Sequence, residues 1–237
     1  MKITHTSKKV GDCSKEECEE CFALLTKLFA GITKKDFLRD LSQKERIILL
    51  HDKEISKIVG FSTLTTWKMK VGSEEVSLIF SGDTAVDPRA RSATGLGLGL
   101  LGYFEDVMKR SQNRVYYGLI SKGWRTYRIL DRFFQNYYPH YSRSSQYKEV
   151  ARIFGRTFFD DRFDERTGVL SSSSGDSPRV ICDQDVQLPS TNDRASQFFL
   201  ETNPNYRKGD ELVCIAEVCS DNFTRLTNRI LLRGGLV

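Results

Sequence analysis

The sequence has few of the residues on which several protein classes depend. Among its 237 residues there are only five prolines, three histidines and six cysteines. No apolar run approaches the roughly 20 residues that a membrane-spanning helix needs. The charged first residues lead into an acidic segment and lack the apolar stretch of a secretory signal. We therefore expect a cytoplasmic protein without a membrane span.

Cysteine and histidine are too sparse and scattered to predict a disulfide framework or a metal site. Cysteines in a chain without a secretory signal are usually reduced. Cys18 and Cys21 have the spacing of metal ligands, whereas Cys214 and Cys219 are too far apart for a zinc knuckle. We interpret the first pair as small residues on a helix face, with a metal pair as the alternative, and expect no bound metal.

The charge of the chain is mildly positive, with a formal net charge of +5 at pH 7. The cations form no basic tail, so we expect no nucleic acid partner. One denser group has spacings of three and four, which put its members broadly on one side of a helix: Lys122, Arg125, Arg128 and Arg132. This group is either a solvated surface or a surface for cofactor phosphates or an acidic carrier protein.

Apolar periodicity predicts a mixed α/β fold. The hydrophobic content of 39% supports one large domain, or one domain with an extension. The predicted elements, in chain order, are helices at 14–31 and 35–41, strands at 46–51, 57–67 and 76–86, a helix at 95–109, a strand at 114–120 and a helix at 124–134. This order indicates a mixed sheet with antiparallel hairpins and a right-handed β-α-β crossover.

The character of the sequence changes after about residue 141. The predicted elements there are a helix at 146–159, a serine-rich linker at 171–175, a weak strand at 179–182, a helix at 195–200, a strand at 211–218 and a helix at 222–232. We therefore predict a core domain over 1–140 and a C-terminal α/β extension over 141–237 that packs on it.

A strand, a glycine cluster and a helix follow one another in the middle of the chain. The strand at 76–86 leads through Asp87 and Pro88 into Gly95, Gly97 and Gly99, where an amphipathic helix begins. Unpaired backbone N–H groups at the positive end of a helix, with no side chains in the way, suit a phosphate. The pattern favours a pyrophosphate-bearing acyl or nucleotide cofactor.

The order of elements and these local motifs resemble the GNAT superfamily of acyl-CoA-dependent N-acyltransferases, over roughly residues 1–140. Residues 58–64 look like its third strand, and residues 86–88 with 93–97 look like its fourth strand and cofactor loop. The family has Gln or Arg three residues before the first loop glycine, where this chain has Ser92. Arg89 or Arg91 would have to replace that anchor.

The resemblance implies a GNAT-like fold with two parallel strands that splay apart at the centre of the sheet. The thioester arm of the donor would lie in that gap, and a backbone N–H of the first strand would polarise its carbonyl. Here the strands are 79–86 and 115–120. The residues implied to contact the acyl-CoA or acyl carrier protein thioester are Ala85, Val86, Arg89, Arg91, Thr94, Gly95, Leu96 and Gly97.

Asp83 is the predicted catalytic residue, either as a base or as a carboxylate that orients the amine. Amine acylation needs a neutral amine, an oriented thioester carbonyl, groups that bind the developing oxyanion and a proton donor for the leaving thiolate. Asp83 interrupts an apolar strand that would face the gap, and burial raises the pKa of a carboxyl group. The alternative is that Ser81, Gly82 and Asp83 form a bulge whose carboxylate satisfies loop amides.

Tyr127 and Tyr138 are the candidates for the proton donor. They lie on or just after the helix that follows the second of these strands, where the family often has a tyrosine near the cofactor sulfur. Tyr116 and Tyr117 alternate along a strand and are interpreted as packing residues.

Two functions of different classes remain open. The first is an N-acyltransferase that moves an acetyl or longer acyl group from acyl-CoA or an acyl carrier protein to an amine of a small molecule or peptide. The second is a non-catalytic GNAT-like binding module whose altered loop no longer holds the cofactor. Residues 121–127 with 203–204 and 209–213 are similar to a bacterial branch of GNAT-like proteins.

Overall fold

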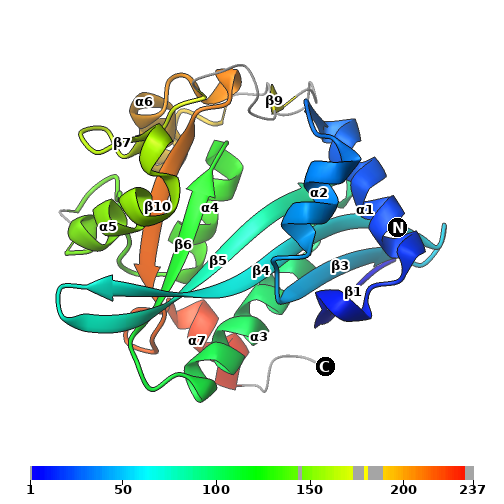
Figure 1. The fold of residues 1–237 in the computed structure, drawn as a ribbon, viewed down its shortest axis with the longest axis horizontal. Coiled ribbons are helices and arrows are strands. Elements are labelled where there is room, and N and C mark those ends of the chain that lie inside the picture. Colours follow the sequence, from blue (N-terminus) through cyan, green and yellow to red (C-terminus); the bar gives the residue numbers. More distant parts are fainter. Residues whose placement is uncertain (1, 144–145, 173–178, 181–188, 233–237) are drawn as a thin grey trace.

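The computed structural model describes residues 2–143, 146–172, 179–180 and 189–232. Within these ranges one eight-stranded mixed sheet has the order β1-β3-β4-β5-β6-β10-β8-β7 (Figure 1). Its strands are β1 (Ile3–Lys9), β3 (Arg46–Asp52), β4 (Lys57–Val71), β5 (Glu74–Val86), β6 (Val115–Ser121), β7 (Phe163–Asp164), β8 (Val169–Leu170) and β10 (Glu211–Glu217). The predicted mixed α/β class is confirmed.

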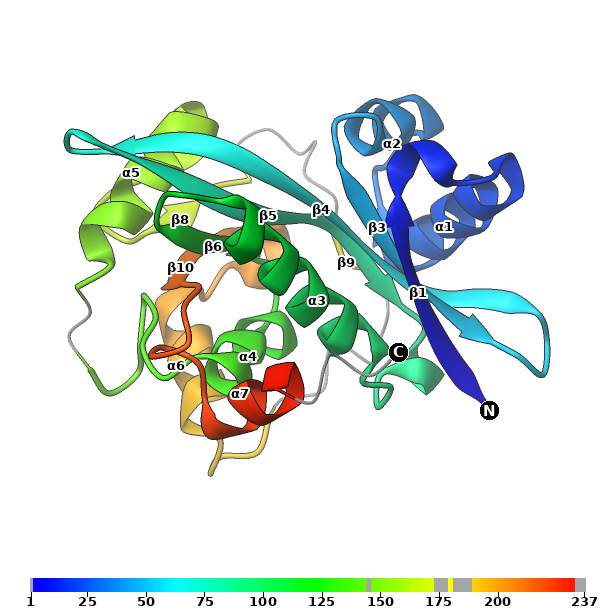
Figure 2. The same ribbon diagram turned by 90° about the horizontal axis from the view of Figure 1, so that it is seen from below.

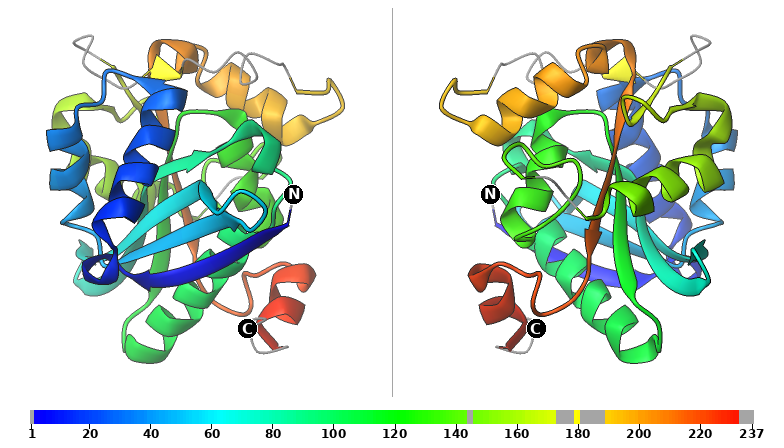
Figure 3. Two further views of the ribbon diagram at one scale, coloured as in Figure 1. Left: turned by 90° about the vertical axis from the view of Figure 1, so that its right-hand side faces the viewer. Right: turned by 90° about the vertical axis from the view of Figure 1, so that its left-hand side faces the viewer.

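The sheet is antiparallel except at its centre. Strands β1, β3, β4 and β5 pair antiparallel in turn, β5 pairs parallel with β6, and β10 returns antiparallel to β6. The predicted strands at 46–51, 57–67, 76–86, 114–120 and 211–218 are present. Strand β1 was not predicted, because an edge strand of mostly polar residues carries no apolar alternation. Figure 3 shows β1 at one edge and β10 toward the other.

Helices cover both faces of the sheet (Figure 2). One face, here called the α1 face, carries α1 (Lys15–Leu28), α2 (Lys34–Leu41) and α5 (Lys148–Phe159). The other, called the α3 face, carries α3 (Gly95–Arg110), α4 (Trp124–Phe133), α6 (Arg194–Thr202) and α7 (Arg225–Leu232). Successive residues of a strand point to opposite faces and so pack in different cores. Ile79 packs with α3, whereas Phe80 packs with α5.

Helix ends follow local capping chemistry. Ser14 caps α1 as predicted, because its hydroxyl accepts from the Glu17 amide while the Glu17 carboxylate accepts from the Ser14 amide. The last helix begins at Arg225, three residues later than predicted. Asn222 is instead bonded to Asn136 and to the Glu217 carbonyl. No helix in the described ranges is long and apolar enough to cross a membrane.

The C-terminal region shares the sheet and both cores with the preceding residues. Strand β10 pairs with β6 over six residues, and Phe154 of α5 lies against Gly118 of β6. Residues Arg179–Val180 form β9, which pairs with β2 (Phe29–Ala30) in a separate two-stranded sheet. The rest of that predicted strand, Cys182 included, and residues 173–175 of the linker lie outside the described residues. The division at residue 140 stays a prediction.

Candidate functional site

The two central parallel strands separate within the sheet. Pairing between β5 and β6 runs from Ser77 opposite Val115 to Phe80 opposite Gly118 and then stops. Strand β5 continues to Val86, and the two strands point in different directions beyond the last paired row (Figure 1). Neighbouring parallel strands therefore diverge, as the GNAT resemblance implies, and we call the region between β5 and β6 beyond this row the gap.

A β-bulge lies in β5 just beyond this row. Ser62 pairs with Thr84 and Leu64 with Ser81, so Gly82 and Asp83 together oppose one residue of β4. A Cβ at Gly82 would lie 2.5 Å from Cε of Lys44 and 2.7 Å from Oγ1 of Thr63, so glycine allows both side chains to lie close to the bulge. The predicted bulge is therefore present. Among the described residues, however, no amide donates to the Asp83 carboxylate.

Asp83 is half-buried, and its surroundings disfavour the ionised form of its carboxyl group. Burial is the main cause that raises the pKa of its carboxyl group from 3.8 to about 6, and Asp40 and Glu211 raise it further. Lys44 and Lys122 act in the opposite direction. A carboxylate with this pKa can accept a proton near neutral pH.

Charged side chains surround Asp83 on both sides of the gap. Lys44, with 4% of its side chain exposed, lies beside the bulge with its Nζ 2.5 Å from the Asp40 carboxylate. At the end of β6, Nζ of Lys122 lies 3.0 Å from the carboxylate of Glu211, whose side chain is also 4% exposed. Arg162 donates to the same carboxylate at 2.7 Å. We call these residues the gap cluster: Asp40, Lys44, Asp83, Lys122, Arg162 and Glu211.

The sequence identified only part of this cluster. Asp83 was predicted as a base and Lys122 as a member of a basic surface. Lys122 in fact precedes α4 and binds Glu211, while Arg128 pairs with Asp193 at 3.3 Å. Arg125 stacks on the ring of Trp124. Much of the predicted basic surface is therefore engaged within the chain.

Backbone amides of β5 alternate between its two neighbours. The Asp87 amide donates to the Val59 carbonyl of β4 at 2.8 Å. Because the direction alternates along a strand, the Ala85 amide also points to β4, whereas the Val86 amide points to the gap side. Of the two amides expected to contact the thioester carbonyl, Val86 has the suitable direction.

The loop between β5 and α3 brings the expected phosphate contacts to the start of a helix. Thr94 is the N-cap of α3 and its hydroxyl makes no capping bond. Arg89 donates to the Asp87 carboxylate through Nε and Nη2, at 3.0 and 3.1 Å, and these bonds are the main cause that lowers the pKa of Asp87 to about 2. Arg89 is thus held within the chain, and Arg91 is half-buried just after a 3₁₀ turn.

The glycines of α3 also have a packing role. A Cβ at Gly95 would lie 2.7 Å from a methyl of Leu50, and one at Gly97 would lie 3.0 Å from the ring of Phe133. Leu96, the residue between them, packs partly buried against two cores. The glycine cluster therefore lets α3 approach the sheet and α4 closely.

The structure does not bring the predicted tyrosines to Asp83. Tyr127 is fully buried on the α3 face and its hydroxyl donates to the Pro139 carbonyl at 2.7 Å, whereas the bulge faces the α1 face. Tyr138 pairs with Ile215 of β10 on the side away from β6, so two strands separate it from β5. Burial raises the pKa of both phenols.

Tyr117, which was predicted only to pack in the core, also carries a hydroxyl close to the gap. Tyr116 and Tyr117 do face opposite sides of the sheet, as predicted. The Tyr117 hydroxyl is 2.9 Å from Oγ of Ser81, next to the row where strand pairing ends. No sequence motif marks this pair, because it depends on the register between two strands.

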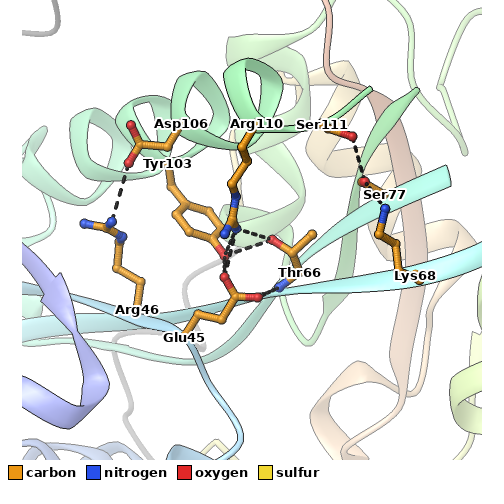
Figure 4. Close-up of polar contacts among 9 residues, drawn as sticks. All are labelled: Glu45, Arg46, Thr66, Lys68, Ser77, Tyr103, Asp106, Arg110 and Ser111. Carbon is orange, nitrogen blue, oxygen red and sulfur yellow. Dashed lines mark hydrogen bonds and ion pairs between the residues drawn. The ribbon is translucent and has the colours of Figure 1, made fainter. Parts of the chain in front are cut away.

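A second polar cluster joins α3 to β4 and to Glu45, the residue before β3 (Figure 4). The carboxylate of Glu45 accepts from Nη2 of Arg110 at 2.8 Å, from the hydroxyl of Tyr103 at 2.9 Å and from the amide of Thr66 at 3.0 Å. It borders a hollow of about 520 Å³ that also includes Arg46. These bonds tie one helix to two strands, which indicates a structural role.

Tyr103→Phe should lower the free energy of unfolding by about 1 kcal/mol or more, because it removes the hydroxyl that donates to the partly exposed Glu45 carboxylate and also bonds to the Thr66 hydroxyl and to Arg110. Urea denaturation at pH 7 would measure the change, with an unchanged slope. Binding at the gap should be unaffected. An unchanged midpoint would contradict the role given to this cluster.

No group of three or more His, Cys, Asp or Glu side chains in the described part of the chain could hold a metal ion. The described cysteines are unpaired thiols, and burial raises the pKa of Cys21 most among the three N-terminal ones.

No protein-family model and no curated protein sequence matches the chain. Solved structures do match in part. An Enterococcus faecalis protein of unknown function, described as a probable N-acyltransferase, matches 56% of the chain at 18% identity and a TM-score of 0.44. A GCN5-related N-acetyltransferase from Kribbella flavida matches 57% of the chain at 13% identity and a TM-score of 0.42. The N-myristoyltransferase of Saccharomyces cerevisiae with bound myristoyl-CoA matches 52% of the chain at 19% identity and a TM-score of 0.38.

The matches cover only about a third of the length of each of these three proteins: 33%, 34% and 33% in turn. With TM-scores below 0.5 and identities below 20%, these matches carry no conclusion about the activity, substrate or partners of this chain.

Proposed function

We propose that the chain is an N-acyltransferase, which moves an acetyl or longer acyl group from an acyl thioester to an amine. The main support is the position of Asp83, a carboxyl group with a pKa of about 6, at a bulge beside the gap between two parallel strands. A base of this pKa can deprotonate an amine that enters the gap.

The donor would be acyl-CoA or an acyl carrier protein. Its thioester arm would lie between β5 and β6, with the carbonyl oxygen near the Val86 amide. The same strand leads within nine residues to Gly95, where α3 begins, and the first-turn amides of that helix would bind the pyrophosphate. Strand and helix thus offer both contacts on one connected segment.

The reaction would be direct transfer without a covalent enzyme intermediate. Asp83 accepts a proton from the ammonium group of the acceptor, and the neutral amine nitrogen then forms a bond to the thioester carbonyl carbon. The Val86 amide donates to the oxyanion that develops. The carbon–sulfur bond breaks, the leaving thiolate takes up the second proton that the nitrogen loses, and the products are an amide and a thiol.

A second candidate function is a binding module without catalysis, and the ion pair of Arg89 with Asp87 favours it. Arg89 is held by Asp87, and Ser92 stands where the family has a phosphate anchor. If the remaining amides bind phosphate too weakly, the fold would no longer hold the donor.

A binding experiment separates these candidates. Thermal shift and native mass spectrometry would test CoA, acetyl-CoA, longer acyl-CoAs and an acyl carrier protein, since a ligand of the folded state raises its melting temperature. Thr94→Asp puts a negative charge at the start of α3 and should weaken acyl-CoA binding about tenfold. Gly102→Asp, at an open position of the same helix, is the matched control and should leave binding unchanged. Absence of binding by every thioester would support the binding module.

A further inference from the structure

We infer that the acceptor carries a carboxylate on the same molecule as its amine, and that Lys122 binds this carboxylate while Asp83 faces the amine. The inference rests on the proposed acyl transfer and specifies its acceptor as an amino acid or short peptide. Glu211 and Arg162, from the C-terminal region, hold Lys122 in place.

Strand register puts Asp83 and Lys122 at similar heights on the two sides of the gap. Phe80 and Gly118 form the last paired row. Asp83 follows Phe80 by three residues and Lys122 follows Gly118 by four, which puts them about 10 and about 13 Å beyond that row. The charge of Lys122 acts on the Asp83 carboxyl group and lowers its pKa, so the two side chains are neighbours across the gap.

The same alternation puts both groups on one face of the sheet. Val213 of β10 packs with α5 on the α1 face, so Glu211, two residues earlier in the same strand, points to that face, and Lys122 is bound to its carboxylate. The bulge at Gly82 faces the same side, where it contacts Lys44. An acceptor that enters from the α1 face would reach both groups.

Lys122 retains hydrogen-bonding capacity. An ammonium group has three donors, and one is directed at Glu211 at 3.0 Å. The side chain is 25% exposed, so a ligand can reach it. Because Glu211 is buried and also accepts from Arg162, it fixes the position of the ammonium group.

The local charges favour an anionic group on the acceptor. Lys122 and Arg162 share one carboxylate, that of Glu211, which leaves one positive charge on this side of the gap. On the other side Lys44 and Asp40 balance each other. With Asp83 ionised, the opening thus offers one negative and one positive group, and a molecule with both an amine and a carboxylate complements them.

The experiment compares acceptors that differ only in the carboxylate. The full chain with acetyl-CoA and with longer acyl-CoAs would be given free amino acids and dipeptides, each beside its C-terminal amide, and thiol release would be followed. We expect kcat/KM to be about tenfold or more higher for the carboxylated member. Lys122→Met should lower kcat/KM about tenfold more for the carboxylated acceptors than for their amides, mainly through KM, and so remove that preference. Arg132→Gln, at an exposed cation of α4, is the matched control.

Three outcomes would overturn the inference. These are equal use of acids and amides by the unmodified chain, an equal loss for both in Lys122→Met, and thioester binding without transfer to any carboxylated amine. The last two leave donor binding intact, so they are distinct from failure to bind any thioester, which overturns the proposed function itself. Thermal shift gives a second readout. A carboxylated acceptor should still raise the melting temperature of the Asp83→Asn variant, and the corresponding amide should not.

Discussion

Asp83→Asn is expected to lower the rate of acyl transfer by about a hundredfold or more, the usual contribution of a positioned base. Asparagine has a similar shape but cannot accept the amine proton at neutral pH. Donor binding should persist, because the thioester contacts assigned above are backbone amides. Steady-state thiol release and native mass spectrometry would measure the two effects.

The same substitution should stabilise the fold. The pKa of Asp83 is raised to about 6 from 3.8, so the folded chain favours the protonated acid. The unfolded chain ionises first, and the free energy of unfolding therefore falls as pH rises from about 4 to about 6. Removing the charge should recover up to about 3 kcal/mol at pH 7 and little at pH 4.

Activity should have the opposite pH dependence. The unmodified chain should gain activity as pH rises through about 6, where Asp83 ionises, and then reach a plateau. Asp12→Asn, at an exposed carboxylate, is the control and should change neither property. A stabilised Asp83→Asn variant with full activity would assign Asp83 a structural role and reject it as the base.

Phe154→Ala should cost about 3–5 kcal/mol, a large part of the 5–15 kcal/mol that stabilises a typical domain. Phe154 is fully buried in α5 and packs with the rings of Phe80, Phe158 and Phe159. Its ring also fills the space above Gly118 of β6. Chemical denaturation would measure the loss.

Two further variants make this prediction specific to the contact with β6. Gly118→Ala should destabilise by about 1–3 kcal/mol, because a Cβ there would lie 2.9 Å from the Phe154 ring. Combining it with Phe154→Leu should cost less than the sum of the two single changes, since the new methyl group fills vacated space. Strictly additive losses in the double variant would contradict this contact. So would a loss of stability in Phe154→Ala that is no larger than the loss in Ile153→Ala, at a partly buried neighbour.

The sequence by itself determined the elements whose causes are local. Apolar alternation gave the central strands, and the capping pattern at Ser14 gave the start of α1. The order of these elements was also enough to predict a mixed sheet, whereas the separation of its two parallel strands was implied by the resemblance to the GNAT superfamily. Edge strand β1 was not predicted, because its residues are mostly polar. It forms by pairing with β3, which is distant in the sequence.

Only the tertiary structure decided which groups meet at the gap. Lys44, Lys122, Arg162 and Glu211 lie far apart in the sequence, and no motif joins them to Asp83. The register of β5, β6 and β10 brings them together, and a bulge of one residue sets the face to which Asp83 belongs. The same register placed Tyr127 and Tyr138 elsewhere. Periodicity shows whether a residue is buried, but long-range pairing decides what lies beside it.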